Sequence, residues 1–333
     1  MVEPAVDVVG VGNAIVDVIA NVPESYLGEH NMVKGSMTLV EAGEAVVMYD
    51  RMPPGIEISG GSAANTAAGV ASLGARAAYI GKVRDDQLGE VFRHDMRAGG
   101  VTFETSAATA GDPTARSLVH VTPDGERTMN TCLGISAFLH PDDIDPDLVA
   151  NAAITYCEGY LWDREVAKDA IRFAMEVAES AGRVVSMTLS DSFCVDRHRD
   201  EWMELIGAHV SLVFANEAEV CALFETDDFD EACRRLAEMV EVAAVTRSEA
   251  GSVVLSAGER VDVPASPIDR LIDATGAGDL YASGFLYGLS AGASLPRCAQ
   301  LGSIAAAEVI THLGARPLVS LRDLVAADGS VDR

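Results

Sequence analysis

Short apolar runs alternate with longer amphipathic stretches along most of the chain. A continuous apolar run such as VDVVGVG at 6–12 is typical of a parallel strand that is covered on both faces. Within 164–180, Ala167, Ile171 and Ala174 recur three or four positions apart, so they share one face of a predicted helix. This alternation predicts an α/β fold with a mostly parallel central sheet flanked by helices. Further strand-like runs lie at 77–81, 152–157, 183–189, 210–214, 242–246 and 252–256.

A second helix is predicted over 294–313, where apolar positions from Leu295 to Leu313 again follow helical spacing. We expect Gly314 to cap this helix, because glycine readily adopts the left-handed conformation in which many helices end. Pro317 cannot donate a backbone hydrogen bond, so it prevents the helix from continuing.

Two stretches break the strand–helix rhythm and indicate a second, smaller sheet. The alternating run 114–122, a PDGE turn and the run 127–131 together predict a β-hairpin. KGSMTLV at 34–40 also has strand character. We therefore expect a small β lid beside the main body, formed from about 14–40 and 112–132.

Composition narrows the classes of protein that this pattern allows. The 333 residues carry 24 basic and 51 acidic side chains, a formal net charge of −27, which argues against general nucleic-acid binding and a polybasic membrane anchor. No apolar run approaches the ~20 residues that span a bilayer, and the N-terminus lacks the basic segment of a signal peptide. Six cysteines without a CxxC pair are expected to be reduced thiols. We expect one cytoplasmic domain over 1–333.

The most informative motif is DATGAGD at 273–279, which is followed by an apolar helical run. A glycine-rich turn that opens a helix presents free backbone N–H groups at the positive end of the helix dipole, which favours phosphate binding. Asp279 is suited to act as a base that takes the proton from a hydroxyl attacking the phosphate. An ordinary helix N-terminus with an acidic first turn is the structural alternative.

A second glycine turn, SGGSAAN at 59–65, precedes an alanine-rich helix. Gly60 and Gly61 would let the backbone approach a ligand closely, and Asn65 in the first helical turn would point to the same place. A tight strand–helix junction without any ligand explains the same residues.

The N-terminal segment GVGNAIVDV at 10–18 begins like a dinucleotide fingerprint but fails it, because Ile15 occupies the third glycine position. Asn13 and Asp17 are polar residues in an otherwise apolar strand, and both could hydrogen-bond a polyol. The alternatives are a turn asparagine and a solvent-facing aspartate.

NEAE at 216–219 follows the strand-like run 210–214. Open parallel sheets bind ligands at the carboxyl ends of their strands, so Asn216 and Glu219 could hold a hydrated Mg²⁺ against phosphates. The same spacing is that of a helix capping box. The chain has no GxxxxGK[ST] motif, which excludes a P-loop.

In their order along the chain, these motifs resemble the PfkB/ribokinase family of carbohydrate and nucleoside kinases. GxGNxxxD at the N-terminus, GGxxxN near 60, NxxE near 216 and DxTGAGD near 273 carry the resemblance, which extends from about residue 6 to about residue 315. GERTMNT, GYLWD and LSDSF are similar to the adenosine kinase-like branch. Ala274 departs from the family, in which Thr or Pro is more frequent. The resemblance implies a ribokinase-like fold.

The resemblance also implies a role for each matching residue. Asp279 is similar to the family's catalytic base, Gly276, Ala277 and Gly278 to its anion hole, and Arg127 to an arginine that contacts the transferring phosphate. The other matches are Asn13, Asp17, Gly61, Ser62 and Asn65 for the sugar hydroxyls, Asn216, Glu219, Thr246 and Gly251 for ATP, and Glu219 for Mg²⁺ through water. Activation by K⁺ is left open.

The activity that the resemblance implies is ATP-dependent phosphorylation of the 5′-hydroxyl of a nucleoside, with adenosine as the first expectation. Ribose or fructose, inosine or guanosine, and a non-catalytic ligand-binding protein are the alternatives. The base of a nucleoside needs apolar or aromatic neighbours. The candidates are Met37, Leu133, Trp162 and Phe193, each of which could equally pack the core or the lid. We expect no nucleic-acid or membrane partner, and a monomer and a homodimer are both left open.

Overall fold

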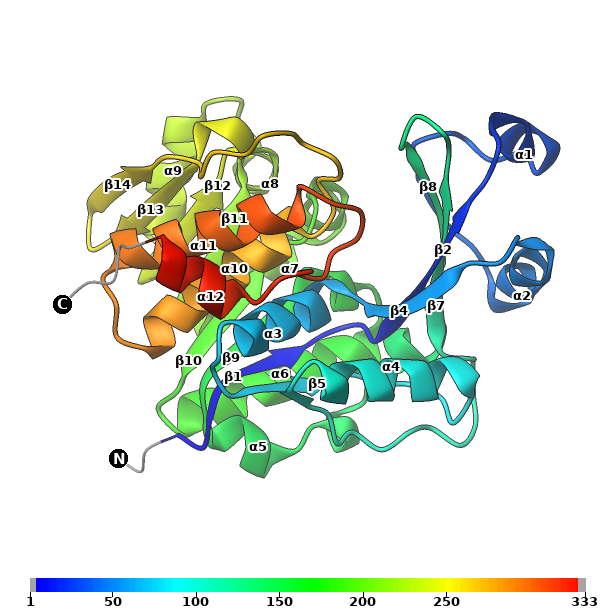
Figure 1. Cartoon of the computed structure of the whole chain (residues 1–333). Helices are drawn as coiled ribbons and strands as arrows, with labels where there is room; N and C mark the ends of the chain where they lie inside the picture. The colour runs from blue at the N-terminus through cyan, green and yellow to red at the C-terminus, as the bar shows by residue number, and fades with distance from the viewer. Residues whose placement is uncertain (1–3, 329–333) are drawn as a thin grey trace.

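Two β-sheets form the framework of the molecule in the computed structural model, which describes residues 4–328 (Figure 1). Within the described residues the larger sheet has nine strands, and only β13, next to the edge strand β14, runs antiparallel to the rest. The expectation of a mostly parallel central sheet with a second small sheet is confirmed. In sheet order the strands are β14 (Glu259–Val263), β13 (Ser252–Ser256), β12 (Val242–Thr246), β11 (Leu212–Asn216), β10 (Val184–Thr188), β9 (Ala152–Glu158), β1 (Val6–Val11), β5 (Ala77–Ile80) and β6 (Val101–Thr102).

The apolar runs read from the sequence coincide with seven strands of this sheet. The analysis missed β6 and β14, for different reasons. β6 has only two residues, which is too short for a periodic signal. In β14 charged residues interrupt the run ERVDV, because this strand lies at the exposed edge of the sheet and needs little apolar surface.

Helices cover both faces of the large sheet because alternate residues of its strands are apolar on both sides. Val9 and Val11 of β1 belong to one buried cluster, and Val8 to the other. One face carries α5 (Pro146–Ala150), α6 (Glu165–Ser180), α7 (Ser192–His209), α8 (Glu217–Phe224) and α9 (Phe229–Ala237). The opposite face carries α3 (Ser62–Ser72), α4 (Gln87–Ala98), α10 (Ala277–Ser290) and α11 (Leu295–Val309), and α12 (Leu321–Ala327) packs beside them.

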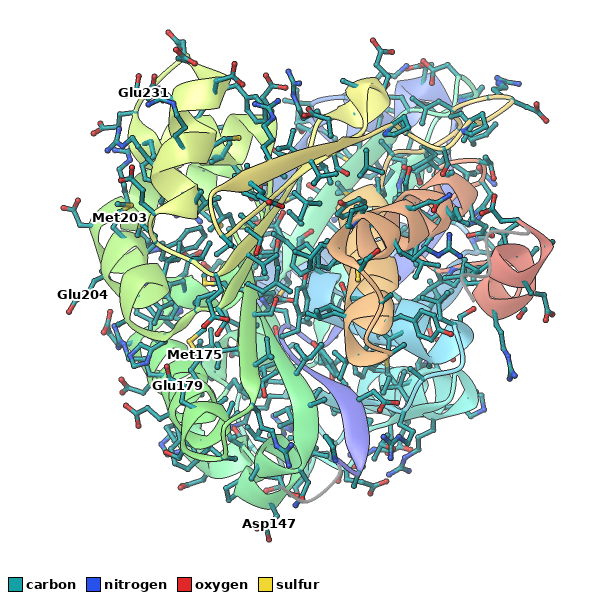
Figure 2. All side chains as sticks on the ribbon, turned by 90° about the vertical axis from the view of Figure 1, so that its left-hand side faces the viewer. Asp147, Met175, Glu179, Met203, Glu204 and Glu231 are labelled. Carbon is teal, nitrogen blue, oxygen red and sulfur yellow. The ribbon has the colours of Figure 1, made fainter. Side chains whose placement is uncertain are left out.

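The outer surface of the helices is strongly acidic. Figure 2 shows Glu179, Glu204 and Glu231 pointing outward from α6, α7 and α9, whereas Met175 on α6 is fully buried. No helix within residues 4–328 combines the length and hydropathy that crossing a membrane requires.

The small sheet stands to one side of the large one (Figure 1) and contains the predicted hairpin. Its strands, in sheet order, are β3 (Met37–Leu39), β8 (Arg127–Cys132), β7 (Ala115–Val121), β2 (Ile15–Asn21) and β4 (Ile56–Gly60). β4 was not predicted. Two helices, α1 (Glu24–Glu29) and α2 (Ala42–Arg51), cover one face: Tyr26 stacks on His120, and the Arg116 guanidinium lies over the Tyr49 ring. The opposite face of the small sheet is turned toward the body.

The helix predicted over 294–313 ends earlier than expected. α11 stops at Val309, because the carbonyl of Ile310 accepts hydrogen bonds from the backbone N–H of Ile272 (2.8 Å) and of Asp273 (3.3 Å). Gly314 does have a positive φ of 95°, but it lies in the following loop and does not cap the helix. The expected cap is therefore wrong, and the loop instead runs back to the DATGAGD motif.

Candidate active site

The N-terminus of α10 is an open turn with unused backbone donors. Gly276 is the N-cap residue with φ of 79°, and a Cβ there would lie 2.7 Å from the Cβ of Ala315, so glycine is required on two grounds. A Cβ at Gly278 would meet nothing within 4 Å. Among residues 4–328, no acceptor is recorded for the N–H groups of Gly278 and Asp279. These donors and the helix dipole form a site suited to a phosphoryl group.

Asp279 is held in place by the helix that follows the second glycine turn. Ser62 Oγ donates to its Oδ1 (2.6 Å), Asn65 Nδ2 donates to its Oδ2 (2.8 Å), and Thr66 Oγ1 donates to its backbone carbonyl (3.1 Å). Burial raises the pKa of Asp279, although both side-chain hydrogen bonds and the nearby charge of Arg316 oppose the shift. Three residues that the sequence assigned to one site, Ser62, Asn65 and Asp279, are thus in direct contact.

Arg127 on the small sheet reaches the same helix N-terminus. Its Nη1 donates to Asp273 Oδ2, and both side chains are nearly buried, at 9% and 6% exposure. Asp273 also accepts hydrogen bonds from the backbone N–H of Thr275 (2.9 Å) and of Gly314 (3.0 Å). Burial alone would raise the pKa of Asp273, but these hydrogen bonds and the Arg127 charge outweigh it, so the pKa is lowered. The ion pair joins the small sheet to the body.

Among the predicted sugar ligands, Asp17 carries the carboxylate. No hydrogen-bond partner of this carboxylate is recorded within the described part of the chain. It lies on β2, and burial raises its pKa to about 6, while the charges of Arg127 and Arg316 oppose the shift. The sequence left open a solvent-facing side chain, but Asp17 is half-buried. A partly buried acceptor without a partner is suited to receive ligand hydroxyl groups.

Arg316 is a half-buried cation that none of the sequence motifs indicated. Its guanidinium donates to the carbonyl of Ser59 (3.0 Å) and to the carbonyl of Ala64 (2.6 Å). Burial lowers its pKa to about 10, and its charge acts on both Asp17 and Asp279. The sequence gives only a weak signal, because Arg316 follows the predicted end of a helix and belongs to none of the motifs.

Asn13 marks the point where the chain passes from the large sheet to the small one, and it is fully engaged with the protein. Its backbone N–H and its Nδ2 donate to Glu158 Oε1 (2.8 and 2.7 Å), and its Oδ1 accepts from Ser136 Oγ (2.8 Å). Gly61, where the chain passes back, has φ of 96°, and a Cβ there would lie 2.2 Å from the Asn13 carbonyl oxygen. Both residues therefore shape the junction of the two sheets.

Glu158 at the end of β9 is the second residue that the analysis missed. Besides Asn13, its carboxylate accepts from the backbone N–H of Ala63 (2.8 Å), which ties the N-terminus of α3 to the junction. It is 1% exposed, and burial raises its pKa to about 7. A signal was available, since a carboxylate directly follows the apolar run 152–157.

Asn216 and Glu219 form the capping box that the sequence left as an alternative. Glu219 N–H donates to Asn216 Oδ1 (2.9 Å), and Asn216 N–H donates to Glu219 Oε2 (3.0 Å). The arrangement also fits a magnesium site. Burial raises the pKa of Glu219 to about 7, so a nearby dication would stabilise its charged form. No cluster of three or more His, Cys, Asp or Glu suited to a metal occurs within residues 4–328.

Thr246 and Gly251 lie next to this box. Asn216 at the end of β11 pairs with Thr246 at the end of β12, and Thr246 Oγ1 donates to the carbonyl of Ala215 (3.4 Å). Gly251 has φ of 88°, and a Cβ there would lie 2.1 Å from the carbonyl oxygen of Val263. Asn216 and Thr246 thus lie at neighbouring strand ends, Glu219 lies in the first turn of α8, and Gly251 directly precedes Ser252, the β13 residue paired with Thr246.

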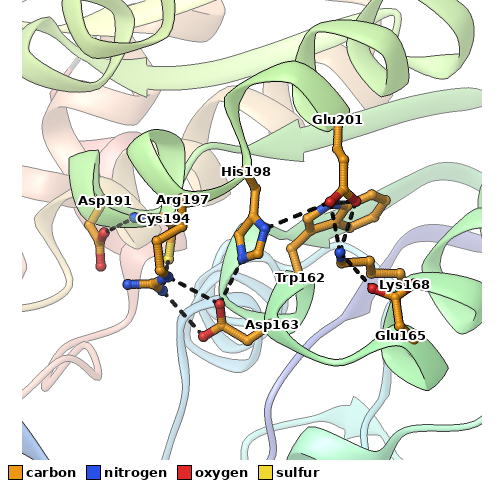
Figure 3. A network of polar contacts seen from close by, with 9 residues as sticks. All are labelled: Trp162, Asp163, Glu165, Lys168, Asp191, Cys194, Arg197, His198 and Glu201. Atoms are coloured by element: carbon orange, nitrogen blue, oxygen red, sulfur yellow. Dashed lines mark hydrogen bonds and ion pairs between the residues drawn. The ribbon is translucent and has the colours of Figure 1, made fainter.

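Two of the four candidates for contacting a nucleoside base, Trp162 and Phe193, lie apart from the hollow that Leu133 lines. Figure 3 shows Trp162 in a polar network between α6 and α7, where its Nε1 donates to Glu201 Oε2 (3.1 Å) and the side chain is fully buried. Phe193, the second residue of α7, lies on the surface and is 73% exposed. Trp162 is therefore a core residue, and Phe193 is a surface residue.

Leu133, by contrast, lines a hollow at the junction of the small sheet and the body. Other apolar side chains of its lining come from Leu39 at the end of β3, from Phe138 in the short helix η1 (Gly134–Phe138) and from Tyr160 in η3 (Gly159–Asp163). Charged residues line it as well, namely Glu41, Asp112, Asp163 and Arg164. Met37, two residues before Leu39, is about half exposed on the edge strand β3. The sequence analysis assigned neither Leu39 nor Tyr160 to the site.

Comparisons with known proteins agree with this arrangement over nearly the whole chain. A family model described as pfkB family carbohydrate kinase matches residues 56–321. The solved structure of adenosine kinase from Sinorhizobium meliloti is 55% identical, with a TM-score of 0.90, covering 98% of this chain and 99% of that one. A probable sugar kinase from Rhizobium etli is 50% identical, with a TM-score of 0.91 and the same coverage. The adenosine kinase of Saccharomyces cerevisiae is 27% identical over 325 residues, which is 91% of this chain and 94% of the yeast protein.

Proposed function

Because the chain belongs to the pfkB family of carbohydrate kinases, we propose that it is an ATP-dependent nucleoside kinase that converts adenosine to AMP. The fold is ribokinase-like, and a kinase of this family acts on an alcohol group of a sugar or nucleoside. The similarity to the Sinorhizobium adenosine kinase supports the finer assignment. The observation that carries it is the pattern of side chains on the inner face of the small sheet, which is the face turned toward Asp279.

Two rows of side chains, one polar and one apolar, cross this inner face. Register pairs Asp17 with Ser117 and Ser117 with Thr131, and the two hydroxyls lie 2.9 Å apart. The next row on the same face joins Ile19, Val119, Met129 and Met37. Rows two residues apart on a strand are separated by about 6.7 Å, which is comparable to the distance between a ribose and its base. A polar row for ribose beside an apolar row for a base favours a nucleoside.

The hollow at the same junction combines the apolar and aromatic side chains of Leu39, Leu133, Phe138 and Tyr160 with charged ones, which are Glu41, Asp112, Asp163 and Arg164. Aromatic side chains stabilise a purine by stacking and by excluding water. A planar purine gains more from such stacking than a free sugar does. The hollow begins at Thr131 of the polar row, on the side away from the apolar row, so it is a second candidate surface for the base.

The chemistry follows from the positions of four groups. Asp279 takes the proton of the 5′-hydroxyl while the hydroxyl oxygen attacks the γ-phosphorus of ATP. The bond from this phosphorus to the β–γ bridging oxygen breaks, and ADP leaves. The N–H groups of Gly278 and Asp279 and the Arg127 guanidinium stabilise the charge on the transferring phosphoryl group. Mg²⁺ held near Glu219 would neutralise charge on the phosphates of ATP. Residues 1–333 would form one domain, and the small sheet would close over the site as a lid that excludes water.

The decisive experiment measures ADP release with Mg·ATP for adenosine, inosine, guanosine, ribose and fructose. We expect kcat/KM for adenosine to exceed that of each sugar by at least about 100-fold, which corresponds to about 2.7 kcal/mol of transition-state binding. Leu133→Ala should raise KM for adenosine and leave the sugars unaffected. Val33→Ala, which truncates an exposed residue outside the hollow, is the matched control. A sugar preferred over every nucleoside would contradict the assignment.

A sugar kinase is the second candidate, favoured by the 50% identity to the probable sugar kinase of Rhizobium etli. The same panel separates the two. Activation by K⁺ and the choice between a monomer and a homodimer stay open; exchange of K⁺ for Na⁺ tests the first and light scattering the second. A cytoplasmic location stays a prediction. The free cysteines, most of them buried, are in keeping with that last expectation.

A further inference from the structure

Asp273 stands at the meeting point of the small sheet, the anion turn and the loop after α11. Its Oδ1 accepts from Thr275 N–H, and its Oδ2 accepts from Gly314 N–H and from Arg127. Two backbone donors of the body thus hold the Asp273 carboxylate in place, independently of its ion pair with Arg127. A fixed carboxylate sets the position of the guanidinium bound to it, since charged hydrogen bonds of this kind are short and directional.

Arg127 retains a donor that the ion pair leaves unused. Its Nε is buried and has no hydrogen-bond acceptor among the residues that the structure describes. A buried guanidinium donor without an acceptor costs free energy, so it favours binding of an anion beside it. Arg316, the other cation near the site, already donates to Ser59 and Ala64. Arg127 is therefore the cation with a donor to give to a phosphoryl group.

The surrounding charges make the position of this cation important. Asp17, Asp273 and Asp279 all act electrostatically within the site, and the phosphoryl group of ATP would add further negative charge. Without a restraint, the Arg127 side chain could pair with any of these carboxylates. Contact with Asp273 holds it between the small sheet and the N-terminus of α10.

From this geometry, and resting on the proposed kinase activity, we propose that Asp273 is a positioning residue for phosphoryl transfer. It holds the Arg127 guanidinium at the edge of the anion turn through Nη1 and leaves Nε for the transferring phosphoryl group. The anion site is then complete when the small sheet is docked against the body, because docking brings Arg127 to Asp273. Asp273 itself touches neither substrate.

A double-mutant cycle of Asp273→Asn and Arg127→Ala tests this role. Asp273→Asn should lower kcat by about 10- to 100-fold through misplacement of the guanidinium, with KM for the acceptor changed less than about threefold. Arg127→Ala should lower kcat by about 1,000-fold. In the Arg127→Ala background, Asp273→Asn should change kcat by less than about twofold, because the two residues act as one unit.

A purely structural carboxylate would give a different result, in which the two losses multiply and KM rises together with the fall in kcat. The matched control is Asp143→Asn. Like Asp273, Asp143 forms an ion pair, here with Lys82 (2.6 Å), and accepts a backbone hydrogen bond, here from His140 N–H (2.7 Å). This variant should leave kcat unchanged in both backgrounds. Wild-type turnover with multiplicative losses overturns the role of Asp273, whereas no wild-type turnover on any acceptor overturns the proposed function.

A structure of the wild-type complex covers the case in which Asp273→Asn does not fold. With a non-hydrolysable ATP analogue and the acceptor bound, we expect Arg127 to contact Asp273 and the γ-phosphoryl group at the same time. A guanidinium that leaves Asp273 on binding the phosphoryl group would overturn the proposal.

Discussion

Among single residues, burial rather than neighbouring charge decides the state of most site carboxyls. Burial is the largest contribution to the raised pKa values of Asp17, about 6, and of Glu158 and Glu219, both about 7. Asp273 shows the opposite outcome, since its hydrogen bonds and the Arg127 charge lower its pKa despite burial. The pKa values of Asp17 and Asp273 thus shift in opposite directions, although both are aspartates. The Asp273 carboxylate has hydrogen-bond donors around it, whereas none is recorded for Asp17 within the described residues.

Asp17 gives a prediction about pH at this scale. The ionised carboxylate accepts stronger hydrogen bonds from ligand hydroxyls than the protonated group does, so kcat/KM should fall as the pH drops through about 6. Asp17→Asn should be less active and should lose this part of the profile, because its amide does not titrate. Kinetics between pH 5 and pH 8, roughly the range in which such a group titrates, provide the measurement. If the fall persists unchanged in Asp17→Asn, another group, such as Asp279, controls it.

The sequence identified polar residues in unusual places but could not assign their partners. Asn13 fits a polyol ligand in the sequence, yet its amide is occupied by Glu158 and Ser136. Trp162 fits an aromatic base contact, yet it donates to Glu201 in the core. In both cases the partner lies far along the chain, and a local pattern carries no information about it.

At the scale of elements, most strands and the start of α10 follow from local patterns. The seven apolar runs became strands of the large sheet because each is buried on both faces. The end of α11 did not follow, since the hydrogen bonds that end it come from Ile272 and Asp273 in another segment. Local signals fix where an element begins more reliably than where a tertiary contact stops it.

A substitution at Gly278 in α10 should change stability and activity in opposite directions. Gly278→Ala introduces a Cβ with no neighbour within 4 Å, so the protein should be stabilised by about 0.5 kcal/mol through the better helix propensity. The same Cβ would occupy space that the phosphoryl group needs, and kcat should fall at least about 10-fold. Urea unfolding and ADP release are the two measurements.

Gly43→Ala is the control for this prediction. Gly43 is also the second residue of its helix, α2, and a Cβ there likewise meets nothing within 4 Å. This variant should gain similar stability with kcat unchanged. Equal kcat in Gly278→Ala and the wild type would mean that the open turn does not bind the phosphoryl group.

Across the whole molecule, the formal net charge of −27 is a source of repulsion that no local contact removes. Raising the ionic strength from about 0.02 M to about 0.5 M shortens the Debye length, so the free energy of unfolding should increase. Urea unfolding at several NaCl concentrations measures this. A decrease with salt would mean that ion pairs such as Arg260–Asp230 stabilise the fold more than repulsion destabilises it.

The sequence by itself determined the α/β class, seven strands of the central sheet, the predicted hairpin and the order of motifs that led to the kinase family, because hydrophobic periodicity and glycine turns are local properties. Only the tertiary structure decided which of the motif residues meet. It joined Asp279 to Ser62 and Asn65, set Arg127 on Asp273, brought Glu158 and Arg316 close to these residues, and placed Trp162 in the core and Phe193 on the surface. The physical reason is that contacts between distant segments depend on how whole sheets and helices pack, which no short stretch of sequence encodes.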